Sequence, residues 1–152
     1  DYITVKEERT HIESYLEIQQ FRYQDILDYE IQMDEKIYGY IIPKLTLQPL
    51  VENALYHGIK NKRGKGRIVV TGRREKDKCA IRVEDNGIGM TKERLNQVRG
   101  GLTTKIEDSN DFYGLYNVNE RIRLKFGEGY GLSIDSVLQE GTCVEVWLPW
   151  ES

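Results

Sequence analysis

Residues 84–90 constrain the fold of this chain more than any other part of its sequence. They follow a run, residues 79–84, in which side chains alternate between two faces with the period of a β-strand. The alternation stops at Asp85, and Gly87 and Gly89 follow it. Glycines allow positive φ and the close approach of another group. A carboxylate beside such a turn is an acceptor directed at a partner, although Asp-Asn-Gly alone is equally typical of a surface turn.

The composition is that of one soluble globular domain with a hydrophobic core. A net charge of -3 predicts neither a nucleic-acid binder nor an acidic tail. No apolar run approaches the roughly 20 residues that span a bilayer, and no signal peptide opens the chain. Cys79 and Cys143 lack metal-site spacing and are predicted to be reduced core residues of a cytosolic domain. The chain opens without Met in a helical pattern, so we expect it to be a piece of a longer protein.

A polar helix is predicted near the N-terminus, over about residues 4–23. The segment contains no Gly or Pro, and Thr4 and Glu7 have the spacing of a capping box. Its polarity is typical of a connector or partner-binding helix, and the sequence leaves open whether it packs on the domain. We interpret its His11 as a solvated side chain rather than a phosphate acceptor or ligand.

Residues 45–58 predict a second helix, with apolar residues at intervals of three and four that pack inward. Pro49 suits its first turn, and Gly58 is expected to end it. Asn53 and His57 fall near the edge of the buried stripe. The predicted strands are residues 29–33, 67–73, 79–84, 130–138 and 142–148, with a short extended piece over 37–42.

Residues 99–111 differ in kind from the rest, because they are rich in Gly, Thr and Ser and carry few apolar side chains. They separate a short helix predicted over 91–98 from one predicted over 112–126. About a dozen structureless residues inside a compact domain are typical of a functional lid. Residues 60–67 carry five basic side chains, which we interpret as a solvated loop rather than a nucleic-acid site.

Three separate pieces point to one chemistry. Asn53 offers an amide oxygen suited to a hard cation. Asp85 lies at a strand end beside glycines, and Gly114 opens a helix whose free N–H groups and dipole favour an anion. Together they predict a site for a purine, phosphates and Mg²⁺. The chain contains no Walker A sequence, which makes the common nucleotide-binding folds poor candidates.

The same residues resemble the sequence boxes of the GHKL ATPase superfamily, which includes gyrase, Hsp-type chaperones, histidine kinases and MutL. Residues 50–54 resemble its N box, residues 85–90 its first glycine box, Gly114-Leu115 the second and Gly141-Thr142 the last. Four boxes in order, at compatible distances, are a specific signal. The sequences around the N box and the second glycine box further resemble sensor histidine kinases of the LytS/YesM type.

The resemblance implies the fold and the domain division. The fold would be an α/β (α+β) two-layer sandwich of the Bergerat type, a mixed, largely antiparallel sheet with helices on one face, preceded by an N-terminal helix. Residues 1–25 would be the C-terminal end of a dimerisation and phosphoacceptor segment. Residues 26–152 would be the HATPase catalytic, ATP-binding domain.

The resemblance also implies roles for single residues. Asp85 would accept a hydrogen bond from the adenine amino group, with Thr142 supporting that corner, and Asn53 would ligate a Mg²⁺ ion that bridges the phosphates. Residues 99–113 would form the ATP lid. The residues implied to contact the nucleotide are Asn53, His57, Lys60, Asp85, Gly87, Gly89, Met90, Gly114, Leu115 and Thr142.

By the same resemblance the chain is expected to be the catalytic domain of a protein-histidine kinase. It would present the γ-phosphate of ATP to a histidine on its own dimerisation helices, and a response regulator would receive the phosphate later. The chain lacks the Asn-Pro-His-Phe-like acceptor sequence of this kinase type, so the acceptor is expected outside it. The full-length protein would be a homodimer, a membrane-anchored bacterial receptor with this domain in the cytoplasm.

Some positions depart from the family pattern. Pro49 stands where many histidine kinases have a second Asn, Tyr56 where Lys is common, and Phe112 where Gly is common. Gyrase-like members carry a water-activating Glu four residues before the Asn. Here Glu52 is adjacent to Asn53 instead, about 100° round the helix, which argues against a built-in hydrolase. Two alternatives stay open: a gyrase- or chaperone-like ATPase, and a nucleotide-sensing interaction module without transfer activity.

Overall fold

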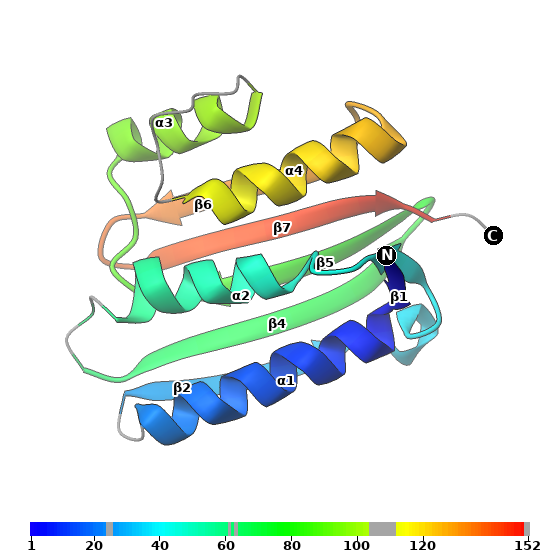
Figure 1. Cartoon of the computed structure of the whole chain (residues 1–152). Helices are drawn as coiled ribbons and strands as arrows, with labels where there is room; N and C mark the ends of the chain where they lie inside the picture. The colour runs from blue at the N-terminus through cyan, green and yellow to red at the C-terminus, as the bar shows by residue number, and fades with distance from the viewer. Residues whose placement is uncertain (24–25, 61, 63, 104–111, 151–152) are drawn as a thin grey trace.

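The computed structural model describes residues 1–23, 26–60, 62, 64–103 and 112–150. These residues form a five-stranded sheet and a layer of helices that covers one face of it (Figure 1). The strands lie in the order β2-β4-β5-β7-β6, with β2 and β4 parallel and the other neighbours antiparallel. Their bounds are β2 Leu27–Met33, β4 Gly66–Glu75, β5 Lys78–Asp85, β6 Gly131–Val137 and β7 Gly141–Pro149. The predicted two-layer sandwich with a mixed, largely antiparallel sheet is confirmed.

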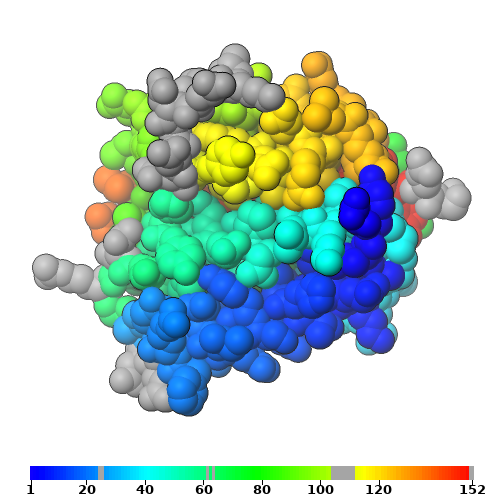
Figure 2. Space-filling model, viewed as in Figure 1, coloured from blue at the N-terminus to red at the C-terminus, as the bar shows by residue number. Residues whose placement is uncertain are grey.

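The helical layer places one helix over the middle of the sheet. Its α-helices are α1 Val5–Arg22, α2 Gln48–Asn53, α3 Lys92–Thr103 and α4 Tyr113–Phe126. The last turn of α2 continues into a π-helical segment, η2 Ala54–Ile59, which packs on β4, β5 and β7. Figure 2 shows α2 between α1 and α4 on this face of the molecule. Among the described helices, none is both long and apolar enough to cross a bilayer.

The N-terminal helix belongs to the same hydrophobic core as the rest of the domain. Thr4 and Glu7 form the predicted capping box at its start. Its buried side chains Val5, Ile12 and Leu16 are fully enclosed and join the apolar side chains of the other helices and the sheet. The predicted helix is therefore confirmed, and the structure adds that it packs on the domain.

A buried carboxylate on α1 holds the segment that leads into α2. Glu8 is 1% exposed, and its two oxygens accept hydrogen bonds from the backbone N–H groups of Leu45, Thr46 and Leu47, with N···O distances of 2.6–2.9 Å. Burial raises the pKa of Glu8, and these three donors oppose the rise. Since Leu47 offers no side-chain cap to α2, the carboxylate of α1 fixes where α2 begins.

Two short predictions near the N-terminal half were wrong in their bounds. The extended piece expected over 37–42 is shorter, because a 3₁₀ helix, η1 Glu35–Ile37, occupies its start. The strand that remains is β3 Ile41–Pro43, which pairs antiparallel with β1 Tyr2–Thr4. Gly58 does not end the second helix. It lies inside η2, where its Cα packs against the end of β5.

The predicted lid and its flanking helices also differ from the structure. α3 extends to Thr103, so the first part of the predicted lid is helical, and residues 104–111 lie outside the described residues. α4 ends before Gly127, whose φ is 103°, as predicted. Leu124 is 81% exposed, because the inward-facing positions of α4 include Leu115 and Ile122.

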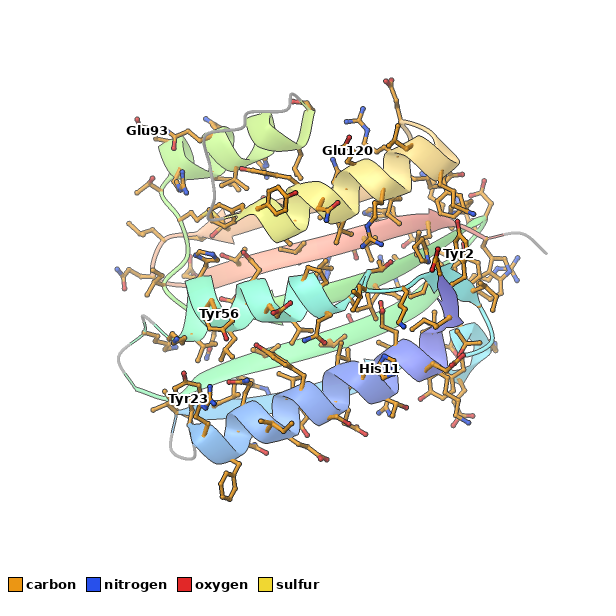
Figure 3. The ribbon with its side chains drawn as sticks, in the orientation of Figure 1. Tyr2, His11, Tyr23, Tyr56, Glu93 and Glu120 are labelled. Carbon is orange, nitrogen blue, oxygen red and sulfur yellow. The ribbon has the colours of Figure 1, made fainter. Side chains whose placement is uncertain are left out.

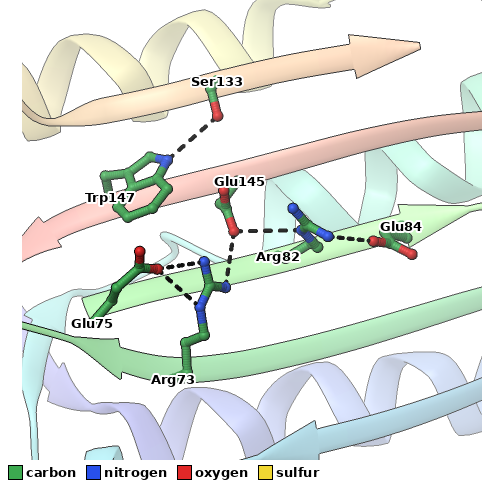
Figure 4. Close-up of polar contacts among 7 residues, drawn as sticks. All are labelled: Arg73, Glu75, Arg82, Glu84, Ser133, Glu145 and Trp147. Atoms are coloured by element: carbon green, nitrogen blue, oxygen red, sulfur yellow. Dashed lines mark hydrogen bonds and ion pairs between the residues drawn. The ribbon is translucent and has the colours of Figure 1, made fainter. Parts of the chain in front are cut away.

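The other face of the sheet carries paired charges in place of helices (Figure 4). Glu145 is 7% exposed, and its Oε2 lies 3.1 Å from Nη1 of Arg73 and 3.4 Å from Nε of Arg82. The two arginines in turn pair with Glu75 and Glu84. These five charged side chains thus form ion pairs with one another. Of the two free cysteines, Cys79 is buried in the core as predicted, whereas Cys143 is only half-buried on this outer face.

Candidate functional site

The end of β5 opens into a cavity of about 180 Å³ beside the start of β7. Asp85 is the last residue of β5, and Thr142 lies opposite it in the sheet register. The hydroxyl of Thr142 lies 2.8 Å from the hydroxyl of Ser136 on β6. Six of the predicted site residues line this cavity: Asn53, His57, Asp85, Gly89, Met90 and Thr142. The pairing of β5 with β7 therefore brings together residues that are far apart in the sequence.

Asp85 is a buried acceptor. Its side chain is 9% exposed, and Oδ1 accepts a hydrogen bond from the N–H of Gly87 at 2.8 Å. Burial raises the pKa of Asp85 to about 6, against the opposing effect of backbone N–H donors and the charge of Lys62. At neutral pH the carboxyl group of Asp85 is ionised yet has little access to water. A hydrogen-bond donor that enters the cavity therefore stabilises the carboxylate.

Glycines make this end of the site tightly packed. A Cβ on Gly58 would lie 2.6 Å from Oδ1 of Asp85, and a Cβ on Gly87 would overlap the carbonyl group of Gly58. Gly89 has a φ of 66°, and a Cβ there would overlap the carbonyl of Val137. The backbones of η2, the turn after β5 and the end of β6 are thus in direct contact. No side chain larger than hydrogen fits at these positions without a shift.

A second cavity, of about 230 Å³, lies between α2 with η2 and the start of α4. Asn53, His57, Gly114 and Leu115 from the predicted set line it, together with Pro49, Glu52, Tyr56 and Phe112. Phe112, the residue before α4, makes no side-chain cap to the helix. The first N–H groups of a helix have no partner within it, so this end of α4 presents donors and a positive dipole end toward an anion.

Asn53 carries an unpartnered oxygen in this region. It is the last residue of α2, it is 8% exposed, and its Oδ1 has no hydrogen-bond partner among the described residues. A buried acceptor without a hydrogen-bond partner destabilises the fold, and a ligand that binds to it would remove this cost. Beside it, burial raises the pKa of Glu52. The described residues contain no group of three or more His, Cys, Asp or Glu side chains placed to hold a metal ion.

The two cavities adjoin each other across a stacked pair of rings. Phe112 lies on His57 with centroids 4.7 Å apart and ring planes 28° apart. Both residues, and Asn53, line both cavities. We call these the purine-side cavity, next to Asp85, and the phosphate-side cavity, next to α4.

Two of the predicted site residues, Gly87 and Lys60, line neither of the two cavities. Gly87 holds Asp85 through its N–H. The Lys60 ammonium lies 4.7 Å from the ring centroid of Tyr56 and 5.9 Å from that of Tyr23, and Figure 3 labels both tyrosines at this end of the helical layer. A phosphate contact by Lys60 stays a prediction. His11 is exposed on α1, away from both cavities, in keeping with a solvated side chain.

Sequence reasoning missed several lining residues. Gly58 was read as a helix end, although the contact between its Cα and Asp85 is what the position requires. Arg94 of α3 and Ile88 line the purine-side cavity. Ile88 lies inside the box at residues 85–90 but was not among the residues implied to contact the nucleotide, and no sequence pattern pointed to Arg94. Phe112 had a signal in the sequence, since it departs from the family pattern, but its place between the cavities depends on the packing of α4 against α2.

The arrangement suits one kind of ligand. A carboxylate acceptor at one end fits a heterocycle with an amino group, and a helix N-terminus at the other end fits an anion. The unpartnered oxygen of Asn53, between the two, fits a hard cation carried by that anion. A nucleotide with its magnesium ion has these three features in this order.

Comparison with known proteins agrees with this chemistry. Residues 43–152 match the family described as histidine kinase-, DNA gyrase B-, and HSP90-like ATPase. The sensor histidine kinase YesM of Bacillus subtilis (strain 168) is 36% identical over 149 residues, which are 98% of this chain and 24% of YesM. The sensor protein LytS of Staphylococcus saprophyticus is 33% identical over 150 residues, which are 99% of this chain and 25% of LytS. The chain thus spans about a quarter of the length of these curated relatives.

Solved structures give the same fold. The catalytic domain of histidine kinase ThkA has a TM-score of 0.71 at 11% identity, covering 98% of this chain and 96% of that one. ThkA in complex with the response regulator protein TrrA has a TM-score of 0.69 at 13% identity, covering 99% of this chain and 42% of that one. At such identities the likeness shows a shared fold.

Proposed function

The chain belongs to the family of histidine kinase-, DNA gyrase B- and HSP90-like ATPases, and on that premise we propose that it is the ATP-binding catalytic domain of a sensor histidine kinase. The family and the LytS/YesM type agree with the four sequence boxes and with the relatives that are 36% and 33% identical. The observation that carries the proposal is the buried Asp85 carboxylate at one end of a site whose other end is the start of α4.

Asp85 would select the purine. Its ionised carboxylate would accept a hydrogen bond from the adenine amino group, a charge-assisted contact about twice as strong as a neutral one. The hydroxyl of Thr142 and the backbone at Gly89 would complete this corner. The tight contact of Gly87 with Gly58 supports a rigid wall against which the base lies.

Asn53 and the start of α4 would hold the phosphates and their cation. Mg²⁺ usually keeps several waters and is bound by one or two protein oxygens plus substrate phosphates. The unpartnered Oδ1 of Asn53 fits that role, and the N–H groups of Gly114 and Leu115 fit the phosphate oxygens. When bound, the ion would neutralise charge on the transferred phosphoryl group.

The chain itself would position the γ-phosphate rather than receive it. Transfer would go to a histidine on a dimerisation helix of the full-length protein, of which residues 1–25 would be the C-terminal end, and catalysis would come from positioning and charge neutralisation. The relatives named sensor histidine kinases support this assignment, and the complex of ThkA with TrrA supports a response regulator as the next partner. Dimerisation and a membrane anchor belong to the same proposal for the whole protein.

One observation favours the alternative of an ATP hydrolase. Glu52 lines the phosphate-side cavity next to Asn53, and burial raises its pKa, as suits a general base. The position of Glu52 in the helix differs from that of the water-activating Glu in gyrase-like members. Steady phosphate release without any acceptor, lost in Glu52→Gln, would favour the hydrolase.

Binding of a fluorescent ATP analogue tests the nucleotide site. We expect Asp85→Asn to weaken binding at least about a hundredfold, which is about 2.7 kcal/mol, while circular dichroism shows an unchanged fold. Asn is isosteric and neutral, so it removes the charge without a cavity. Asp135→Asn, at an exposed position of β6, is the matched control. Equal affinity of Asp85→Asn and the unmodified chain would overturn the site assignment.

Phosphoryl transfer tests the kinase. The chain is incubated with γ-labelled ATP, Mg²⁺ and a fragment that carries the acceptor helix of the full-length protein. We expect acid-labile label on the fragment, in an amount that Asp85→Asn abolishes. Binding of ATP without any transfer to the fragment would favour the nucleotide-sensing module instead.

A further inference from the structure

Phe112 occupies the boundary between the purine-side and phosphate-side cavities. Its side chain is 4% exposed, one face of its ring lies on His57, and the guanidinium carbon of Arg94 lies 5.0 Å from its centroid. Stacked rings and a cation near an aromatic ring both stabilise a defined arrangement. The ring is therefore held in place by partners from η2 and from α3.

Neither cavity alone holds a nucleoside triphosphate. The purine-side cavity measures about 180 Å³ and the phosphate-side cavity about 230 Å³, whereas small-molecule sites usually enclose about 300–1,000 Å³. A nucleotide that reaches both Asp85 and the start of α4 has to cross the wall that Phe112 and His57 share. Binding of such a nucleotide therefore depends on both the size of the cavities and the position of the stacked rings.

We propose that Phe112 is an affinity-setting residue of the nucleotide site, whose ring separates the two cavities and has to leave His57 before ATP occupies both. The inference rests on the proposed ATP-binding function and adds to it a residue that no sequence box assigns. We assign the movement to Phe112, because His57 belongs to η2, a segment whose backbone packs on β4, β5 and β7. Phe112 precedes the first residue of α4, so rotation of its side chain leaves the helix intact.

The stack lowers the apparent affinity for ATP by a population effect. If only the fraction of molecules with an open boundary binds ATP, the apparent Kd equals the intrinsic Kd divided by that fraction. Free adenine needs only the purine-side cavity, so its binding does not require the boundary to open. The affinity for ATP should therefore respond to the position of the Phe112 ring more strongly than the affinity for adenine.

The test is a comparison of Phe112→Ala with the unmodified chain by calorimetric titration with ATP and, separately, with adenine. We expect the Kd for ATP to fall about tenfold, while the Kd for adenine changes less than about twofold. Phe112→Leu keeps apolar volume but has no ring, and we expect its Kd for ATP to fall about threefold. This variant replaces Phe112→Ala in the test if the Ala variant is unstable. Phe21→Ala makes the same change at an exposed position of α1, where the side chain is 78% exposed and lines neither cavity, and it is expected to leave both constants unchanged.

Binding kinetics give a second readout. With a fluorescent ATP analogue in stopped flow, the observed rate for the unmodified chain should level off at high nucleotide concentration, because opening of the stack limits it. The rate for Phe112→Ala should keep rising with concentration. A rate that rises without limit in both proteins would overturn the proposal.

Several outcomes separate this inference from the proposed function. Equal or weaker ATP binding by folded Phe112→Ala, with Asp85→Asn still abolishing binding, overturns the role of Phe112 and leaves the ATP site in place. An equal gain for adenine and ATP also overturns it, since the ring would then cover the purine-side cavity alone. Absence of ATP binding in every variant overturns both.

Discussion

The two cavities of the site share a wall, but one is lined mainly by closely packed backbone and the other by helix ends and side chains. The purine-side cavity is formed by strand ends and by backbone in direct contact, at Gly58, Gly87 and Gly89. The phosphate-side cavity is formed by helix ends and side chains, and it contains an unpartnered oxygen of Asn53 and an uncapped end of α4. The backbone wall of the purine-side cavity is closely packed without a ligand. The phosphate-side cavity keeps polar groups to which a ligand would hydrogen-bond.

Under the proposed function, this difference would separate recognition of the base from the chemistry at the phosphates. A wall made of close-packed backbone changes little when a ligand arrives, so it suits selection of a rigid base. Unpartnered donors and acceptors gain most from a charged, metal-bearing group. Substitutions at the close-packed glycines of the purine side should therefore lower fold stability. Substitution of the Asp85 carboxylate, or of the unpartnered polar groups on the phosphate side, should instead lower ligand affinity.

The largest expected effect is at Gly87. A Cβ there would overlap the carbonyl of Gly58, so Gly87→Ala should lower the free energy of unfolding by more than about 3 kcal/mol and abolish nucleotide binding. Urea unfolding measures the first effect. Gly100→Ala in α3 is the matched control, since a Cβ there meets nothing within 4 Å, and it should stabilise the chain by about 0.5–1 kcal/mol. Equal stability of the two variants would contradict the rigid-wall description.

The next effect concerns the wall of the phosphate-side cavity. Glu8→Gln replaces an acceptor of three backbone N–H groups by a side chain that also donates, so unfolding should become easier by about 2–3 kcal/mol. Glu13→Gln on the same helix breaks only a partly exposed pair with Arg9 and should cost less than about 0.5 kcal/mol. Similar unfolding midpoints for both variants would remove Glu8 from the support of α2.

Asn53→Ala should affect ligand binding without loss of stability. Removing an unpartnered buried amide leaves the free energy of unfolding unchanged or higher, while affinity for ATP with Mg²⁺ falls about tenfold. Without Mg²⁺, in the presence of a chelator, the variant and the unmodified chain should bind alike. Asn117→Ala, at an exposed position of α4, serves as control. A similar loss with and without Mg²⁺ would remove the metal from the role of Asn53.

The smallest expected effect is the pH dependence of purine binding. Because the pKa of Asp85 is about 6, adenosine affinity should fall about fivefold between pH 7.5 and about pH 5.4 as the carboxylate is protonated. Adenosine is the better probe, since phosphates titrate near pH 6 as well. Asp85→Asn should show no such pH dependence.

The same pKa affects stability with the opposite sign. It is raised above the ordinary value of 3.8, so the contribution of protonated Asp85 to stability is complete below about pH 4. That contribution is lost as the pH rises through about 6. Compared with Asp85→Asn, the unmodified chain should lose stability over this range, by at most about 3 kcal/mol. Parallel stability curves for the two proteins would show that Asp85 is not buried in solution.

Much of the fold was readable from local patterns. The capping box at Thr4, the period-two runs of β4 and β5, and the glycine that follows α4 each reflect a rule that acts over a few residues. The errors arose where packing overrides local preference. Gly58 was predicted to end a helix and lies inside a π-helical turn, and the predicted short helix after Thr91 continues to Thr103.

The sequence by itself determined the family, the two-layer fold, and the residues at the two ends of the site, because motif order and periodicity are properties of the chain alone. Only the tertiary structure decided how those ends meet. The register of β5 against β7 puts Thr142 beside Asp85, and the packing of α4 against α2 brings Phe112 onto His57. These contacts join residues that are tens of positions apart in the sequence, and rules based on local residue spacing do not predict such contacts.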